Sequence, residues 1–344
     1  MKRFLSSVPL RTKLIFVGAV IGVVIAVPMI LSMGHGAGGG GKESPKTISV
    51  SDRTTVTETT PPQSPIASPE PTPEPSPTAE TLTPSPTVKT VGGIIDKDTT
   101  WTPVEGPYEL TERVIVREGV TLTIEPGTTI IAENEGDLFW IDGTVIAHGT
   151  PENPIIFDGK GKSNFFSCPP RGSGKAVLDL DFATIKDGIK FWNSLPSGRF
   201  ESLSLKNATL MNIAEVSNIF YPKSDVHIEC NTFINIAGFS VRQDGGTKVY
   251  FQYNTFRDNT FKKAKGDFWI QNEQCIGGSE MIVRYNSFAP ADGIALKLGG
   301  DEAAMIATEN YWNTDDRAVI ASMIKGTIAF EPILTAPPEC PSSD

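Results

Sequence analysis

A degenerate repeat in the C-terminal half of the chain constrains its fold more than any other feature. Each of six segments has two apolar residues two positions apart, then a small residue or Asn three positions later, then a large apolar residue after two more. The segments are LDLDFATIKD, LSLKNATLMN, VHIECNTFIN, VYFQYNTFRD, MIVRYNSFAP and MIATENYWNT, starting at Leu178, Leu203, Val226, Val249, Met281 and Met305. Apolar residues at every second position predict a strand that buries one face.

The distance between repeats predicts how the strands assemble. The small or Asn position recurs after 25, 23, 23, 32 and 24 residues. A unit of this length cannot bury its own apolar face, so successive units must stack. Several units continue with Gly and a second apolar pair, as in residues 238–241, and lack the helix-forming half of other short repeats. Each unit therefore contains a strand, a bend and a second strand, which predicts an all-β solenoid.

The bend positions of the later repeats carry asparagine. Asn tolerates a left-handed backbone better than other non-glycine residues, and its side chain can bond the neighbouring backbone. Stacked coils would place these residues above one another, so we predict a ladder of side-chain amides at the corner. Its members are Asn231, Asn254, Asn286 and Asn310.

Further motifs flank the repeats and carry a family resemblance. They are Thr100-Trp101, Pro107-Tyr108, VIVREGVTLTIEPGTTI from Val114, GTVIAHGTPENPIIF from Gly143, and a closing Glu309-Asn310-Tyr311-Trp312-Asn313. Together with the repeats they resemble the pectate-lyase-like right-handed parallel β-helix proteins, especially exported modules of bacteria and archaea. The closing motif has Asn where Gly is usual. The resemblance implies a single-stranded right-handed parallel β-helix, for which we expect roughly 8 coils over residues 94–334, followed by a tail at 335–344.

The N-terminal segment has the pattern of a membrane anchor. Residues 1–13 contain four basic side chains and no acid, and the 20 residues from Leu14 to Met33 are uncharged. About 20 apolar residues span a bilayer, and a basic flank stays in the cytosol. We therefore expect a cytosolic segment at 1–13, a single-pass anchor at 14–33 and an extracellular β-helix. A cleaved signal peptide is the alternative, and it would make the rest of the chain a secreted protein.

The segment between the anchor and the β-helix is expected to be a disordered stalk, at residues 34–93. It contains no aromatic residue, and ten of the 26 residues from Pro61 to Pro86 are proline. Such a composition cannot form a packed core and favours an extended spacer. Its Thr and Ser residues are possible acceptors of O-linked sugar.

Charge and cysteine content limit the partners. Without the four basic residues of the N-terminal segment, the formal net charge of −10 becomes −14, which argues against nucleic acid. Four cysteines in an exported chain favour two disulfides. Three pairings are possible, and we favour Cys168–Cys230 with Cys275–Cys340, which would tie an insertion and the tail to the stack. No cysteine or histidine spacing indicates a metal site.

The resemblance implies two chemistries, a calcium-dependent lyase with a basic residue and a hydrolase with paired carboxylates. The hydrolase motifs are absent from this chain. The residues between the buried pairs point outward, however, and Asp179, Asp181, His227 and Glu229 are candidates for an acid and a base in a surface groove. The alternative is that they are exposed charges whose pairs contribute about 0–1 kcal/mol each. Ca²⁺ is expected only if the protein is a lyase.

A second outward face suggests ligand binding. The alternation in the second strands predicts that Trp192, Arg242, Trp269 and Lys297 project from it, where rings and cationic groups can contact sugars. The alternative is that a loop after Trp192 covers the ring and completes a minor core.

These features favour a non-catalytic cell-surface module for envelope structure, adhesion or glycan contact, anchored in the membrane and without a cofactor. A polysaccharide lyase or glycoside hydrolase is the alternative. His148 is interpreted as structural, and Asn207 begins a glycosylation motif that a coil corner would shield.

Overall fold

The computed structural model describes residues 88–342, apart from 171, 195–197, 259–267 and 290–292. The predicted cytosolic segment at 1–13, the anchor at 14–33 and the stalk up to residue 87 lie outside these residues. Within the described part of the chain, no helix has the length and apolar character needed to cross a membrane.

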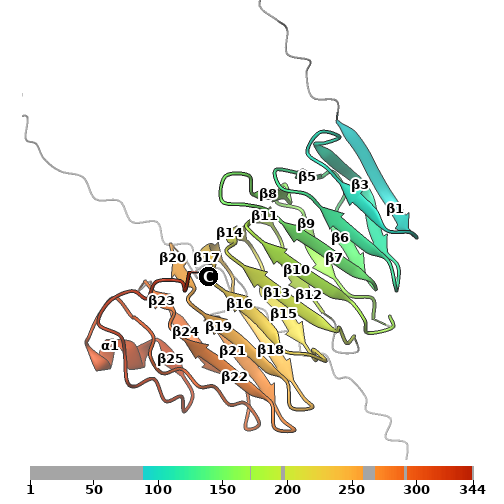
Figure 1. The fold of residues 1–344 in the computed structure, drawn as a ribbon. Helices are drawn as coiled ribbons and strands as arrows, with labels where there is room; N and C mark the ends of the chain where they lie inside the picture. Colours follow the sequence, from blue (N-terminus) through green and yellow to red (C-terminus); the bar gives the residue numbers. More distant parts are fainter. Residues whose placement is uncertain (1–87, 171, 195–197, 259–267, 290–292, 343–344) are drawn as a thin grey trace, which may run out of the picture. The chain divides into compact units, whose positions relative to one another are not determined.

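The described chain forms a right-handed parallel β-solenoid of about nine turns, shown in Figure 1. Its first face is an eight-stranded parallel sheet. The strands are β2 (Thr99–Trp101), β4 (Thr121–Ile124), β7 (Thr144–His148), β10 (Val177–Asp181), β13 (Ser202–Lys206), β16 (Val226–Glu229), β19 (Lys248–Gln252) and β22 (Glu280–Arg284). The predicted parallel β-helix is confirmed, with slightly more turns than expected.

Two further faces complete each coil, and β3 (Tyr108–Val116) contributes to both. The second face contains β5 (Thr129–Ala132), β8 (Ile155–Asp158), β11 (Ala183–Gly188), β14 (Thr209–Ile213), β17 (Thr232–Ile236), β20 (Thr255–Arg257) and β23 (Ser287–Phe288). The third face contains β6 (Gly136–Ile141), β9 (Ser163–Ser167), β12 (Trp192–Asn193), β15 (Ser217–Phe220), β18 (Phe239–Gln243), β21 (Phe268–Cys275), β24 (Ile294–Leu298) and β25 (Ile324–Lys325).

The first strand begins earlier than the sequence suggested. Strand β1 (Lys89–Ile95) pairs in parallel with β3 and packs Val91 and Ile95 against the core. Residues 89–93 were assigned to the stalk because they lack aromatic side chains, and that boundary is wrong. Gly92 lies so close to Glu112 that an added Cβ would meet the Glu112 Cβ at 2.7 Å. This strand therefore depends on glycine for its approach to β3.

The core consists of equivalent residues stacked coil upon coil. The large apolar residue after each corner forms one such column, in which Phe233, Phe256, Phe288 and Trp312 are fully buried. Their ring centroids are 4.7, 5.1 and 4.8 Å apart in succession. Burying a side chain of this size contributes about 1.5–3 kcal/mol. Because this large apolar residue recurs once in each repeat, successive coils place their rings directly on top of one another.

The predicted asparagine ladder is confirmed at the corner between the first and second faces. Asn231, Asn254, Asn286 and Asn310 are at most 1% exposed, and each of the first three amides donates to the next at 3.0 Å. The left-handed backbone falls one residue earlier than expected, for example at Tyr253, where φ is 57°. The asparagine side chain instead points inward and forms hydrogen bonds with backbone groups that have no sheet partner at the bend. These bonds are needed because buried polar groups are costly without a partner.

The C-terminal end is closed by a short helix, α1 (Arg317–Ser322), which buries Ile320. The Asp316 carboxylate accepts from the backbone N–H groups of Ala318 and Val319 at 2.8 and 3.2 Å. Asp316 is therefore the N-cap of this helix.

The predicted disulfide pairings are wrong. The structure joins Cys230 to Cys340, with the Cα atoms 5.6 Å apart. Cys168 and Cys275 form no disulfide within the described residues. The positions of the cysteines explain this result: Cys230 lies at the first corner, whereas Cys168 follows the third-face strand β9 and is buried. Burial also raises the pKa of the Cys168 thiol to about 11. The tail returns along the first corner, where the Leu334 N–H donates to the Asn310 carbonyl, and thereby brings Cys340 to Cys230.

Candidate functional site

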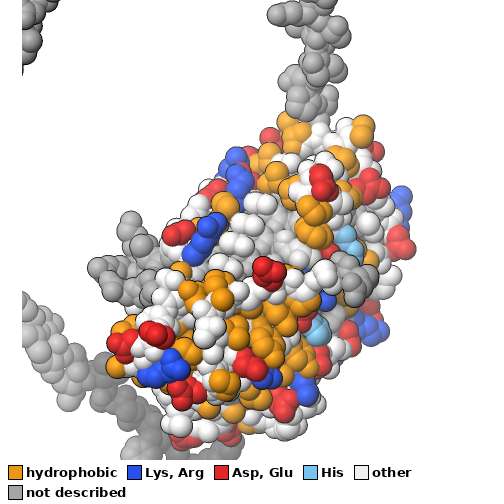
Figure 2. Space-filling model, turned by 60° about the vertical axis from the view of Figure 1, so that its left-hand side comes forward, with side chains coloured by type: hydrophobic (Ala, Val, Ile, Leu, Met, Phe, Trp, Pro, Cys, Tyr) orange, Lys and Arg blue, Asp and Glu red, His pale blue; other side chains and the backbone are white. Residues whose placement is uncertain are grey.

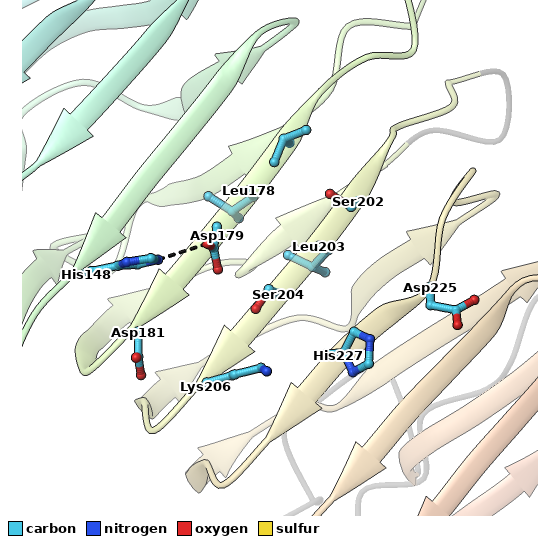
Figure 3. Close-up of a pocket in the computed structure, with 11 residues that line it drawn as sticks. His148, Leu178, Asp179, Asp181, Ser202, Leu203, Ser204, Lys206, Asp225 and His227 are labelled. Atoms are coloured by element: carbon cyan, nitrogen blue, oxygen red, sulfur yellow. Dashed lines mark hydrogen bonds and ion pairs between the residues drawn. The ribbon is translucent and has the colours of Figure 1, made fainter. Parts of the chain in front are cut away.

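A shallow groove with a volume of about 450 Å³ lies on the outer surface of the first face. Strand register places Asp179, Ser204 and His227 side by side on β10, β13 and β16. Figure 3 shows Ser204 between the other two side chains. The remaining lining residues are His148, Val177, Leu178, Asp181, Ser202, Leu203, Lys206 and Asp225. The outward row predicted from the repeat is thus confirmed, and three of the four catalytic candidates line one groove.

His148 and Asp179 make the closest contact in the groove. Nε2 of His148 lies 2.9 Å from Oδ2 of Asp179, and both side chains are more than a third exposed. His148 ends β7 in register with Asp181 on β10. The sequence analysis interpreted His148 as structural because it lies in the family-like entry motif that begins at Gly143. The alternation in its own strand was the signal that could have placed it on the outer face.

The fourth candidate, Glu229, lies at the edge of the groove and is held by its neighbours. Oε1 of Glu229 is 3.0 Å from Nδ1 of His227, and the Lys206 ammonium is 3.4 Å from its other oxygen. The hydrogen bond from His227 is the main cause that lowers the pKa of Glu229, and burial opposes it. Glu229 is therefore an ionised acceptor near neutral pH and a poor general acid.

Asp181 is also engaged, but by a neutral donor. The side-chain amide of Asn207 donates to Oδ1 of Asp181 at 2.8 Å. Asn207 has a φ of 49° at the coil corner. Asn207 is exposed, so the expectation that the coil corner shields this glycosylation motif is wrong.

An apolar stripe continues the groove along the solenoid. Tyr250 is the next residue in the row, and its ring stacks on His227 with centroids 4.9 Å apart and planes at 12°. Ile282 and Ile306 follow in register, and Ile306 is 43% exposed. Figure 2 shows hydrophobic side chains gathered on one face of the domain beside a histidine. The alternation in the sequence puts Tyr250, between Val249 and Phe251, in the same outward row, but it does not indicate the stacked pair.

The predicted tryptophan face does not exist. Trp192 is fully buried and Trp269 is 1% exposed. Strict alternation fails on the third face because adjacent residues there are both buried, as Phe191 and Trp192 are. The Trp192 ring packs on Phe200 at 5.0 Å, so the alternative of a minor core after this residue agrees with the structure.

The two cationic residues predicted beside the tryptophans contact protein groups instead. The Arg242 guanidinium pairs with Glu273 at 2.6 Å and lies 4.6 Å from the Phe220 ring centroid. The Lys297 ammonium lies 4.9 Å from the Phe268 ring centroid. Arg242 and Glu273 also line a polar depression of about 420 Å³ on this face.

A calcium-dependent lyase would need a cluster of oxygen ligands. Among the described residues, no group of three or more His, Cys, Asp or Glu side chains is arranged to hold a metal ion. The donor set of the described residues does not fit such a calcium site.

The fold, the amide ladder and the stacked core define the class of parallel β-helix proteins. Residues 93–165 match the family model of a pectate-lyase-like β-helix domain. Over these residues the chain is similar to pectate-lyase-like β-helix domains, which agrees with the resemblance that the sequence motifs carry. No curated protein and no solved structure matches the chain. Of the groove residues only His148 lies in the matched segment, so the site has to be interpreted from its own chemistry.

Proposed function

We propose that the β-helix is an extracellular carbohydrate-binding module that contacts glycan through the groove on its first face. The observation that carries this proposal is the row Asp179, Ser204 and His227 leading directly to the Tyr250 ring. Carboxylate, hydroxyl and imidazole groups can bond sugar hydroxyls, while an aromatic ring can stack on the apolar face of a sugar. The pectate-lyase-like family supports a carbohydrate-related role.

Binding without catalysis is favoured by the state of the candidate acids and bases. Glu229 is held as an acceptor by His227 and Lys206, and Asp181 by Asn207. Catalysis by paired carboxylates needs one group that stays protonated near neutral pH. The lowered pKa of Glu229 is opposite to that requirement.

Export of the module is part of the proposal. The Cys230–Cys340 disulfide supports it, because structural disulfides persist mainly in oxidising compartments. The apolar stretch from Leu14 to Met33 and the proline-rich stalk also support it from the sequence. In this interpretation the chain is anchored in the cell membrane, or is secreted if the N-terminal stretch is cleaved, and it presents the groove to an envelope glycan.

A polysaccharide lyase or hydrolase is the second candidate, favoured by the His148–Asp179 contact. A carboxylate that orients an imidazole is an arrangement used in proton transfer. Incubation of the full-length protein with a polysaccharide panel separates the two functions. New reducing ends or an unsaturated product that disappears in an Asp179→Asn variant would establish catalysis and contradict the binding-only proposal.

The binding proposal is tested with Ser204→Trp, which fills the centre of the groove. We expect the full-length variant to lose at least about tenfold in affinity for any glycan that the parent binds, equivalent to about 1.4 kcal/mol. Thr232→Trp is the matched control, because Thr232 faces outward on β17, away from the groove. Equal affinities of both variants and the parent would contradict the assignment of the groove.

A further inference from the structure

The charges of the groove indicate which glycans it accepts. Three carboxylates, Asp179, Asp181 and Asp225, line it. Within the described residues, none of the three forms an ion pair with a lysine or arginine. Asp179 contacts the imidazole of His148, Asp181 accepts from the Asn207 amide, and Asp225 accepts from the backbone N–H of Lys248 at 2.8 Å. These partners leave the negative charges of the Asp181 and Asp225 carboxylates uncompensated by a fixed cation.

The nearby cations are paired with other carboxylates. The Lys206 ammonium is 3.4 Å from Glu229, and the Lys248 ammonium is 2.7 Å from Glu280. The His227 imidazole also contacts Glu229. Lys206 is the single lysine or arginine among the described lining residues of the groove. The fixed charge presented to a ligand is therefore negative unless both imidazoles are protonated.

We propose that the ligand of the groove is a glycan of amino sugars with free amines, and that polyuronates are disfavoured. This inference rests on the proposed carbohydrate-binding function and adds the substrate class. A sugar ammonium can donate up to three hydrogen bonds, which suits acceptors that lack a cationic partner. A uronate would bring a like charge to three carboxylates. The Tyr250 ring and the Ser204 hydroxyl next to these acceptors favour a sugar over a simple cationic chain.

The test compares ligands that share length but differ in charge. The full-length protein is titrated calorimetrically, at near-neutral pH and low ionic strength, with four probes. They are the β-1,4-linked tetramer of glucosamine, the β-1,4-linked tetramer of N-acetylglucosamine, a tetramer of galacturonic acid, and tetralysine. We expect the glucosamine tetramer to bind about tenfold tighter than its N-acetylated counterpart, and the galacturonate tetramer to bind least. Added salt should reduce this preference, because it screens exposed charges.

Charge-removing variants locate the effect. Asp179→Asn and Asp225→Asn keep an acceptor oxygen but remove the charge, so each should reduce affinity for the glucosamine tetramer by about three- to tenfold more than affinity for the N-acetylated tetramer. Asp187→Asn is the matched control, since Asp187 lies on β11 at a different corner and contacts Asn212 and Lys186. An equal loss in this control would show that the effect is not local to the groove.

The outcomes separate the two proposals. If neutral or galacturonate tetramers bind as well as the glucosamine tetramer and Ser204→Trp abolishes that binding, the groove binds glycan and the amino-sugar inference is wrong. If tetralysine binds as tightly as the glucosamine tetramer, the groove is a general cation site and the inference is also wrong. If no sugar tetramer binds, or if Ser204→Trp changes nothing, both the proposed function and the inference are overturned.

Discussion

The side-chain amide of Asn254 donates to the side-chain oxygen of Asn286 on the next coil at 3.0 Å, and both residues are fully buried. The same amide also donates to the Ile228 carbonyl at 2.8 Å. The Asn254 oxygen in turn accepts from the backbone and side-chain nitrogens of Asn231, each at 3.0 Å. One side chain thus satisfies polar groups on two neighbouring coils, and the ladder stabilises the corner.

Asn254→Leu should therefore destabilise the domain. It leaves the Asn231 nitrogens and the Ile228 carbonyl without their partner, and each buried orphan costs about 1–3 kcal/mol. Chemical denaturation should show a loss of at least this size. Asn218→Leu is a suitable control because Asn218 is only half-buried and its amide contact, to Asn193, is long at 3.5 Å. An unchanged denaturation midpoint for Asn254→Leu would contradict a structural role for the ladder.

A second prediction concerns the tryptophans that the sequence placed outside. Trp269 packs between Phe256 and Phe288, with ring centroids 5.5 and 5.6 Å away. Trp269→Ala should lower the free energy of unfolding by about 3–5 kcal/mol, because it leaves a cavity in a packed column. Val104→Ala should have little effect, since Val104 is 92% exposed. Equal stability of the two variants would show that the ring is not part of the core.

The alternation of apolar and polar residues correctly predicted the outward row on the first face. The structure differs from the prediction where contacts with residues outside the local pattern determine which side chains are buried. Alternation over five residues was enough to place Asp179, Ser204, His227 and Tyr250 in one outward row. It failed on the third face, where Phe191 and Trp192 are adjacent and both buried. Phe200 packs against the Trp192 ring there, and no local sequence pattern indicates that contact.

The cysteine pairing and the role of His148 failed for a related reason, since both depend on long-range geometry. Cys340 reaches Cys230 only because the tail reverses along the corner, over a separation of 110 residues. His148 faces Asp179 across a coil of 33 residues, the difference between the register partners 148 and 181, which is longer than most of the later repeats. Spacing in the sequence cannot supply either path through space.

A third prediction concerns the thiols. Burial raises the pKa of Cys168 to about 11 and also raises that of Cys275. A raised thiol pKa means little thiolate near neutral pH, so alkylation of the native protein should be slow and should accelerate with rising pH until Cys168 titrates near 11. Unfolding without reductant should expose two reactive thiols, and peptide mapping should recover a Cys230–Cys340 link. Rapid labelling of native Cys168, or recovery of a Cys168–Cys230 link, would contradict the structure.

The disulfide also makes a measurable contribution to stability. Cys340→Ser should reduce the free energy of unfolding by about 2–5 kcal/mol, the usual loss when a native disulfide is removed. Cys275→Ser is the matched control, because the Cys275 thiol forms no disulfide within the described residues and donates to the Ser279 carbonyl at 3.0 Å. Denaturation of both variants under non-reducing conditions gives the comparison. Identical stabilities would mean that the tail is not held in solution as it is here.

The last prediction separates the binding surface from the core. Tyr250 stacks on His227 on the outer face and remains half-exposed, unlike the buried tryptophans. If the stacked pair is the platform for a sugar ring, Tyr250→Ala should reduce glycan affinity about three- to tenfold, while stability changes by less than about 1 kcal/mol. Tyr250→Phe keeps the ring and should bind nearly as well as the parent. Calorimetric titration alongside thermal denaturation measures both effects. A Tyr250→Ala variant that binds normally would remove the aromatic platform from the site, even if the charged part of the groove still binds glycan.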